Sequence, residues 1–352
     1  MNDPGWRVSE NASLRQRNTF GIDAKARWLL EIDDIGALPA ALAQPAWRDA
    51  PLLPLGAGSN LLLAGDFDGV ALAFRARGVA ILGDGETVHL RAQAGLPWHD
   101  FVLWSLDHGL CGLENLSLIP GSIGAAPIQN IGAYGVEIGE FIDTVEAFDR
   151  TSGTFVRIAR ADCAFGYRDS VFKHHADRYV IVAVEFRLPR RRETRIGYAG
   201  IAEELAAMGV AEPTARDVSR AIVAIRQRKL PDPGKLGNAG SFFKNPIVPV
   251  ALAESLQRSH DGIPVFGAGD EGVRKISAAW LIEQAGWKGF REGDAGVSAE
   301  HALVLVNHGN ATGAQLLALA RRIAASVREK FGVEIEPEPR IVGASWLAAG
   351  EP

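Results

Sequence analysis

A glycine-rich segment between two apolar runs constrains the fold of this chain most. PLGAGSN, residues 54–60, follows the apolar strand expected at 52–55, which is the usual place of a dinucleotide-binding loop. Leu61 stands where the third glycine of GxGxxG would be, and LLLAGDFDG then predicts another strand instead of a helix. No helix N-terminus is therefore available for a pyrophosphate, and a Rossmann unit is disfavoured.

The same segment suits a different way of binding an anion. Between two strands, consecutive backbone N–H groups can form a concave nest that faces a diphosphate. A plain tight turn in a β-rich domain would explain the glycines equally well, so the segment by itself leaves both interpretations open. The residues of this candidate nest are Gly56, Ala57, Gly58, Ser59 and Asn60.

A second cluster of small residues, LSLIPGSIGAAPIQNIGAYGVEIG, spans residues 116–139. It is too rich in glycine for a stable helix and too poor in charge for a solvated loop. Close packing of two chain segments would explain the glycines, but not the interspersed Ser117, Ser122, Gln129 and Asn130. We therefore expect a flat, largely apolar ligand to pack on the backbone of this segment.

The order of the expected strands and helices predicts an α+β protein with three domains. Its 352 residues are enough for two or three domains. We expect a small α+β unit over residues 1–69 and a domain of mostly short strands over residues 70–228. A smaller α/β domain is expected over residues 229–332. We expect the C-terminal segment 333–352 to pack near the first unit.

Helices are expected at six places in these domains. The helix from 215 to 228 has Thr214 three positions before Asp217, which resembles a capping box, and it ends at LPDPGKLG. The other helices are expected at 38–42, 97–108, 251–257, 277–285 and 313–331. A strand is expected at 302–306, between the last two helices. In the last helix, apolar residues recur every three or four positions, and this spacing predicts a buried face made of Leu316, Leu319, Ile323, Val327 and Phe331.

Composition excludes several classes of protein. The 37 Lys and Arg residues are outnumbered by 42 Asp and Glu, and Arg190–Arg192 is the longest basic run, so we expect no nucleic-acid partner. Cys111 and Cys163 lie far apart, which predicts neither a disulfide nor a zinc site and fits a reducing compartment. No signal peptide or apolar run of roughly 20 residues occurs, so we expect a cytoplasmic protein that does not enter a membrane. The histidines predict no metal site.

Two polar segments are candidates for chemistry. FGYRDSVFK, residues 165–173, places Arg168 among aromatic residues, where it suits a contact to a carboxylate or phosphate; an ion pair with Asp169 is the alternative. GNAGSFFKNP, residues 237–246, puts the Ser241 hydroxyl in a turn of small residues. No GxSxG surrounds it, so we expect a proton donor in a dry, cation-lined pocket instead of a hydrolase nucleophile.

The C-terminal segment EIEPEPRIVG, residues 334–343, carries alternating charges. If it is a strand, Glu336, Glu338 and Arg340 share one face. A solvated edge strand is the alternative, and the residues alone favour it.

Eight motifs, taken together, resemble one known family, the UDP-N-acetylenolpyruvoylglucosamine reductases, also called UDP-N-acetylmuramate dehydrogenases, of the longer type. The resemblance implies cytoplasmic flavoenzymes of peptidoglycan precursor synthesis, and thus of cell wall biogenesis. It implies an FAD-binding fold of the vanillyl-alcohol-oxidase type in two subdomains plus a smaller substrate-binding domain. The motifs are NTFGIDAKA (18–26), LPLGAGSNLLL (53–63), GLENLSLIPGSIGAAPIQNIGAYGVEI (112–138), FGYRDSVFK (165–173), RQRKLPDP (226–233), GNAGSFFKNP (237–246), AAWLIEQAG (278–286) and EIEPEPRIVG (334–343).

By this resemblance FAD is bound without a covalent link between the first two domains. Its diphosphate is expected on residues 56–60, and its isoalloxazine and ribityl parts along residues 116–135. The protein then supplies orientation and electrostatics for chemistry that belongs to the cofactor. The second loop's expected cofactor contacts are Ser117, Pro120, Gly121, Ser122, Gly124, Ala125, Asn130, Gly132, Ala133 and Tyr134.

The resemblance also implies a reaction in two halves. NADPH reduces the flavin and leaves, and the enolpyruvyl ether of a UDP-sugar then takes a hydride. Arg168 and Glu338 are expected to hold the enolised carboxylate, and Ser241 to deliver the proton to the adjacent carbon. A monomer is expected. The expected substrate contacts are Lys229, Asn245, Tyr198 and Lys275.

One segment departs from the family pattern. Relatives of the longer type carry a tyrosine in a mobile loop over the substrate, whereas residues 260–277 contain none and have Phe266 as their only aromatic residue. Two other functions stay open: an oxidoreductase of the same flavin fold with a different acid substrate, and a nonenzymatic nucleotide-sugar binding protein. The first has no use for Lys229, Asn245 and Ser241 together, and the second has no use for Arg168, Ser241 and Glu338.

Overall fold

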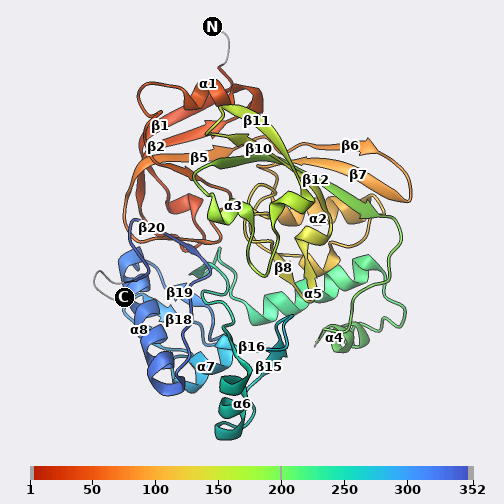
Figure 1. Cartoon of the computed structure of the whole chain (residues 1–352), viewed down its shortest axis with the longest axis vertical. Helices are drawn as coiled ribbons and strands as arrows, with labels where there is room; N and C mark the ends of the chain where they lie inside the picture. Colours follow the sequence, from red (N-terminus) through yellow and green to blue (C-terminus); the bar gives the residue numbers. More distant parts are fainter. Residues whose placement is uncertain (1–3, 199, 348–352) are drawn as a thin grey trace. The chain divides into compact units, whose positions relative to one another are not determined.

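The computed structural model describes residues 4–198 and 200–347 (Figure 1). The chain folds into two compact units, each assembled from separate stretches of sequence. The first unit consists of Met1–Ala12, Ala26–Ala57 and Asp68–Arg228, and the second of Ser13–Lys25, Gly58–Phe67 and Lys229–Pro352. The division therefore passes through the first glycine loop, after Ala57.

A four-stranded sheet forms one part of the first unit. Its strand order is β1 (Trp6–Ser13), β2 (Lys25–Ile32), β5 (Phe67–Phe74) and β3 (Leu52–Pro54), and β3 runs parallel to β5. The short helix α1 (Leu38–Leu42) follows β2. Leu30, Ile32 and Leu72 are buried against Trp28 and Trp47 in the core beneath this sheet.

A five-stranded antiparallel sheet forms the larger part of the first unit. Alternate residues of β7 (Thr87–Gln93), among them Val88 and Leu90, are buried, and they pack with helix α2 (Trp98–Asp107) through Trp98 and Phe101. The ring centroids of Phe101 and Phe186 lie 4.8 Å apart in this core. The strand order is β11 (Thr154–Ala159), β10 (Ile142–Asp149), β12 (Tyr179–Pro189), β7 (Thr87–Gln93) and β6 (Val79–Gly83).

Helices α4 (Ile201–Ala207) and α5 (Ala215–Lys229) close the first unit around a small core of their own. The predicted capping box is confirmed: the Thr214 N–H donates to Asp217 at 3.1 Å, and the Asp217 N–H donates to the Thr214 hydroxyl at 3.2 Å. The shorter elements of this unit are β8 (Gly132–Ala133), β9 (Val136–Glu137), α3 (Val171–His174) and the 3-10 helices Ile35–Ala37, Glu114–Leu116, Ile138–Glu140 and Arg160–Cys163.

Within its described residues, the second unit contains three small sheets, three α-helices and the 3-10 helix Arg15–Arg17. The predicted buried face of α8 (Gly313–Phe331) is confirmed, because its five predicted residues are all buried. The helices α6 (Val250–Ser259) and α7 (Ala278–Gln284) also lie where the sequence predicts them. The sheets are β13 (Gly237–Asn238), β19 (Leu305–Asn307), β18 (Ala295–Val297) and β17 (Arg291–Glu292); β14 (Ile247–Pro249), β16 (Val273–Ile276) and β15 (Val265–Gly267); and β20 (Arg340–Val342) with β4 (Leu61–Leu63).

The C-terminal segment corrects one prediction. The strand expected over 334–343 is confined to β20, so Glu336 and Glu338 do not share a strand face with Arg340. β20 runs parallel to β4, with Arg340 opposite Leu61, so the end of the chain pairs with the strand that follows the first glycine loop. The division into two FAD-binding subdomains and a substrate domain stays a prediction. No helix of the described residues is long and apolar enough to cross a membrane.

Candidate functional site

The first glycine loop joins β3 to β4, as the sequence predicts, and two of its glycines are sterically required. A Cβ on Gly56 would lie 2.6 Å from the Ser122 hydroxyl, so the loop touches the second glycine segment within the first unit. Gly58 has φ +63°, and a Cβ there would lie 2.0 Å from the Arg17 carbonyl oxygen. No larger residue fits at Gly58 without a backbone shift.

The second glycine segment is irregular, as predicted from its composition. Leu118, Gly121, Asn130, Tyr134 and Gly135 all have positive φ, so no helix forms between residues 117 and 137. A backbone that changes direction this often exposes N–H and C=O groups that no regular element uses. Such a surface fits the predicted binding of a flat ligand.

Part of this segment is explained by packing alone. The N–H groups of Ile123 and Gly124 donate to the carbonyls of Leu96 and Ala94, and a Cβ on Gly124 would lie 2.7 Å from the Ala94 Cβ. Gly124 is therefore required by the contact of two chain segments, which is the alternative that the sequence left open for the glycines.

Two predicted cofactor residues use their side chains within the protein. The Asn130 amide accepts from the Gly139 N–H at 2.9 Å and donates to Glu137 at 2.8 Å. The Ser117 hydroxyl donates to the Glu114 carbonyl at 2.7 Å. Any contact of Ser117 with a ligand through a donated proton would have to break this bond, so both side chains serve first to shape the loop.

Arg168 lies beside the second glycine segment. Its backbone has φ +55°, and its guanidinium donates to the Gly132 carbonyl at 2.5 Å. A Cβ on Gly132 would lie 2.9 Å from Arg168 Nη1, so this glycine leaves the space that the guanidinium takes. Asp169, the alternative partner that the sequence suggested, forms a hydrogen bond with the His174 ring at 2.8 Å.

Ser241 and Glu338 lie on neighbouring segments of the second unit. The Glu338 N–H donates to the Phe242 carbonyl at 2.7 Å, and the Asn60 amide donates to the Glu338 carbonyl at 3.3 Å. Pro337 forms a bridge with Phe243. The structure thereby brings Asn60, Ser241 and Glu338, which are distant in sequence, to adjoining stretches of backbone.

The predicted substrate contacts divide between the units. Asn245 accepts from the Ala278 N–H at 2.9 Å and so caps α7, while Lys275 sits on β16 opposite Ile247. Lys229 is exposed at the end of α5. These residues belong to the second unit, whereas Tyr198 belongs to the first, where its ring contacts Tyr134 edge-on at 5.5 Å.

Residues 260–277, which lack the family tyrosine, form β15 and β16 with a short connection. Phe266 stands on β15 and is 47% exposed. An apolar ring that is half open to solvent offers contact area but no hydroxyl donor.

Sequence reasoning missed Arg226, one turn before Lys229 on α5. Its Nε is buried and has no hydrogen-bond partner, and no ion pair joins Arg226 to a carboxylate among the described residues. The Tyr134 phenol shares a side-chain hydrogen bond with the Arg226 guanidinium, and the His99 ring lies nearby. Burial lowers the pKa of Arg226 and raises that of Tyr134. A buried cation without a counterion is costly unless an anion completes it. Arg226 was visible in the motif RQRKLPDP, but only its burial distinguishes it from Arg228.

His301 was also missed. Its Nδ1 accepts from the Leu303 N–H at 3.2 Å, which leaves the proton on Nε2. Burial, with Lys229 and Lys288 nearby, lowers the pKa of His301. The histidine is therefore a neutral donor beside a predicted substrate lysine.

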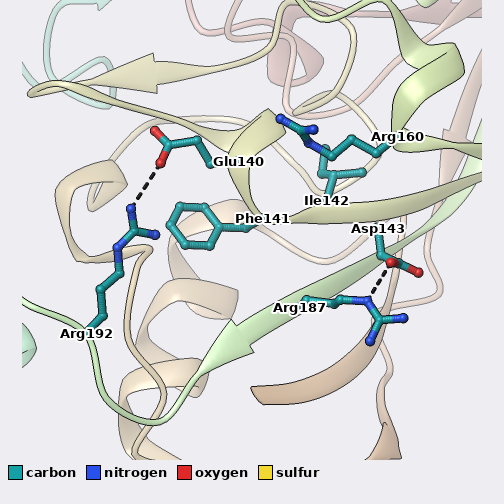
Figure 2. A pocket seen from close by; sticks show the side chains of 7 residues that line it. All are labelled: Glu140, Phe141, Ile142, Asp143, Arg160, Arg187 and Arg192. Carbon is teal, nitrogen blue, oxygen red and sulfur yellow. Dashed lines mark hydrogen bonds and ion pairs between the residues drawn. The ribbon is translucent and has the colours of Figure 1, made fainter. Parts of the chain in front are cut away.

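The pocket in Figure 2 is a different feature. It encloses about 530 Å³ and lies over the start of β10, and none of its residues is a predicted site residue. Its charges are largely paired, since Arg192 contacts Glu140 at 3.1 Å and Arg187 contacts Asp143 at 2.6 Å. We do not assign it to the candidate site.

His89, Asp143 and Glu185 could together offer ligand atoms to a metal ion. Arg187 already pairs with Asp143, and Arg157 pairs with Glu185 at 2.6 Å. These arginines neutralise both carboxylates, so the cluster fits an ion-pair network on the sheet face.

Comparisons with known proteins decide the family. Residues 27–159 match the model of an FAD binding domain, and residues 232–342 match that of the UDP-N-acetylenolpyruvoylglucosamine reductase C-terminal domain. The reductase of that name from Xanthomonas euvesicatoria pv. vesicatoria (strain 85-10) is 60% identical over 97% of this chain and 98% of its own. The chain belongs to the UDP-N-acetylenolpyruvoylglucosamine reductase family. It is thus an FAD-dependent oxidoreductase.

Further family members agree with this assignment. The reductase from Xylella fastidiosa (strain 9a5c) is 57% identical over 98% of this chain and 99% of its own. The crystal structure of the reductase from Thermus caldophilus covers 96% of this chain and 99% of its own, with a TM-score of 0.67 at 24% identity, and so shows the same fold. The predicted α+β fold, with an FAD-binding domain and a family-specific C-terminal domain, is confirmed.

Proposed function

We propose that this chain reduces UDP-N-acetylglucosamine enolpyruvate to UDP-N-acetylmuramate with NADPH as the reductant, a step of peptidoglycan precursor synthesis in the cytoplasm. Near full-length identity of 60% to reductases of that name supports this substrate. We propose that the monomer is the active form. The observation that carries the proposal is the joint presence of Arg168, Ser241 and Glu338 in a chain of this family.

The residues present fit FAD. A Cβ on Gly56 would lie 2.6 Å from the Ser122 hydroxyl, so only glycine lets the first loop approach the second this closely, and the unpaired Arg226 Nε supplies a donor that an anionic group needs. Residues 56–60 and 116–135 would hold the cofactor, the first through backbone N–H groups. FAD, when bound, supplies two-electron chemistry by taking a hydride from NADPH and giving it to the terminal carbon of the enolpyruvyl group.

The protein's own task is to stabilise the charge that then develops on the substrate. After hydride addition the carbon next to the carboxylate carries electron density, which the carboxylate delocalises as an enolate. A fixed guanidinium stabilises such a charge best when it is already oriented before the reaction. The bond from Arg168 to the Gly132 carbonyl provides this orientation, and the remaining guanidinium N–H groups face the carboxylate in our proposal.

Ser241 would give its hydroxyl proton to the carbon next to the carboxylate. A serine hydroxyl is a weak acid, but a carbanion is a strong base, so the transfer is feasible where water is excluded. The backbone hydrogen bond between Glu338 and Phe242 places Glu338 close to Ser241 along the chain fold. In our proposal the Glu338 side chain holds the enolised carboxylate of the substrate, either as a protonated acid or through a hydrogen bond.

Positive and polar side chains would bind the rest of the substrate. Lys229 and Lys275 would contact the diphosphate, Asn245 would contribute the amide group that α7 leaves free, and Tyr198 would pack near the nucleotide. The exposed Phe266 stands in the segment where relatives carry a tyrosine, so we expect an apolar contact there.

An anaerobic titration tests this function. One equivalent of NADPH should bleach the flavin absorption of the purified protein, and the UDP-sugar enolpyruvate should restore the colour rapidly. Bleaching without return would reject the substrate and favour another acid in the same flavin fold. A colourless protein that takes up no added FAD would reject the enzyme and favour a nucleotide-sugar binding protein.

A further inference from the structure

Strand β6 (Val79–Gly83) is an open edge of the five-stranded sheet. It pairs with β7 on one side and, among the described residues, with no strand on the other (Figure 1). Residues 80–83 are all exposed, and the side chains of Ile81 and Leu82 are 53% and 49% exposed. Unpaired backbone beside exposed apolar side chains is a template for pairing with another chain.

Lysine, proline and β-bulges commonly protect such an edge, and β6 has neither lysine nor proline. The register with β7 shifts between Ile81 and Gly83, which leaves Leu82 without an opposite residue. The other edge of the sheet, β11, differs because it carries Arg157, whose guanidinium pairs with Glu146 and Glu185. Each edge thus exposes apolar side chains, Phe155 on β11 and Ile81 and Leu82 on β6, but only β11 also carries a charged residue within the strand.

The charges beside β6 are arranged with opposite signs at its two ends. Arg75 and Arg77 precede the strand, and Asp84 and Glu86 follow it. Arg75 pairs with Asp33 at 3.1 Å and Asp84 with Arg190 at 2.6 Å, whereas neither Arg77 nor Glu86 forms an ion pair within the described chain. Two antiparallel copies of such a segment bring the basic end of each against the acidic end of the other.

We propose that β6 is the contact through which two copies of this chain associate, by antiparallel pairing of β6 with β6. A two-fold axis at Ile81 would place the two Ile81 side chains opposite each other, on the face that Leu90 shares. Beyond the two ends of β6, the same pairing would bring the segment around Arg77 of each copy towards Asp84 and Glu86 of the other. The charge pattern therefore favours a second copy over an unrelated strand.

A contact of five residues per strand is small, so the dimer is weak. Interfaces that bury less than about 1,200 Å² are typical of transient contacts. We expect a mass near 37.7 kDa in dilute assays and a rise toward twice that mass at roughly 100 µM protein. No residue of the proposed active site belongs to this contact, so dimerisation would leave kcat unchanged.

Charge reversal tests the proposal, with sedimentation equilibrium of the FAD-loaded protein as the readout. R77E and E86R should each raise the dimer dissociation constant at least about tenfold, because each turns two attractive contacts into repulsive ones. An equimolar mixture of R77E and E86R should associate again, since the reversed charges then face opposite ones. L82K should abolish association, whereas F155K, which replaces a 46% exposed phenylalanine on β11, should not.

Three outcomes would overturn the proposal. They are a wild-type protein that stays monomeric up to about 200 µM, a dimer that neither charge reversal weakens, and variants that fail to associate when mixed. Loss of the dimer in F155K to the same extent as in L82K would place the contact elsewhere. Flavin absorption and FAD content confirm that each variant is folded.

Discussion

Replacing Arg226 with methionine should change the stability of the protein and its affinity for FAD in opposite directions. In the FAD-free protein the Arg226 Nε is buried without a partner, and such a donor costs about 1–3 kcal/mol. Methionine keeps most of the apolar stem and removes this cost, but it also removes the hydrogen bond with Tyr134, so the FAD-free R226M protein should be more stable by at most about 1–3 kcal/mol. At roughly 2–4 °C per kcal/mol for a unit of this size, its Tm should rise by several degrees.

FAD binding should weaken in the same variant. A hydrogen bond to a charged group is worth about 1.5–3 kcal/mol, which corresponds to a roughly 10- to 150-fold higher Kd for FAD. Reconstitution of the FAD-free protein, followed by quenching of flavin fluorescence, measures this Kd, and a thermal melt of the same sample measures Tm. The two measurements need no substrate, so they are independent of catalysis.

Arg220 supplies the matched control on the same helix. Its side chain is 66% exposed and contacts Asp217 at 3.5 Å, so R220M should leave both Tm and the Kd for FAD nearly unchanged. A lower Tm for FAD-free R226M, together with a Kd within twofold of the wild type, would show that Arg226 is a structural residue. The proposal that it holds an anionic group would then be wrong.

Three other perturbations test separate parts of the site. S241A should leave flavin reduction by NADPH near normal and slow reoxidation by the substrate by about 10²–10⁴-fold in stopped-flow measurements, because only the second half needs the proton; equal loss in both halves would exclude the proton-donor role. G56V should weaken FAD binding more than G65V does, since a Cβ at Gly56 would lie 2.6 Å from the Ser122 hydroxyl and one at Gly65 would meet nothing within 4 Å. Equal Kd values for FAD in the two variants would refute the close contact between Gly56 and Ser122. Because the pKa of His301 is lowered in the folded protein, the unfolded chain binds more protons below about pH 6.5, and the stability of the folded protein should fall as the pH drops through that value. H301N should flatten this pH dependence of Tm in thermal melts at pH 5.5–8. An unchanged pH dependence in H301N would contradict the role assigned to His301.

Local patterns were sufficient for most of the regular elements. The capping box at Thr214 and the apolar spacing of α8 depend on residues three or four positions apart, and the structure confirms both. The first glycine loop was correctly placed between two strands, because Leu61 and the apolar residues after it extend a strand pattern. The helices predicted at 251–257 and 277–285 are likewise confirmed, because their patterns are also local in sequence.

Patterns failed where the partner is distant in sequence. Residues 334–338 alternate in charge like a strand, yet they pair only through single bonds with residues 242–244, and regular pairing begins at Arg340. The prolines at 337 and 339 have no N–H to give to a ladder, which explains the late start. The two-unit division was also hidden, because it places residues 13–25 and 58–67 with the C-terminal part of the chain.

The sequence by itself determined the family, the cofactor class and the residues proposed for chemistry, because motif identity depends on residue type and spacing alone. Only the tertiary structure decided which of those side chains already form hydrogen bonds within the protein. It showed that the Asn130 amide is used within the loop, that Arg226 is buried without a counterion, and that the edge of β6 is uncovered. Burial and pairing are properties of the whole fold, since they depend on which distant segments pack against each residue.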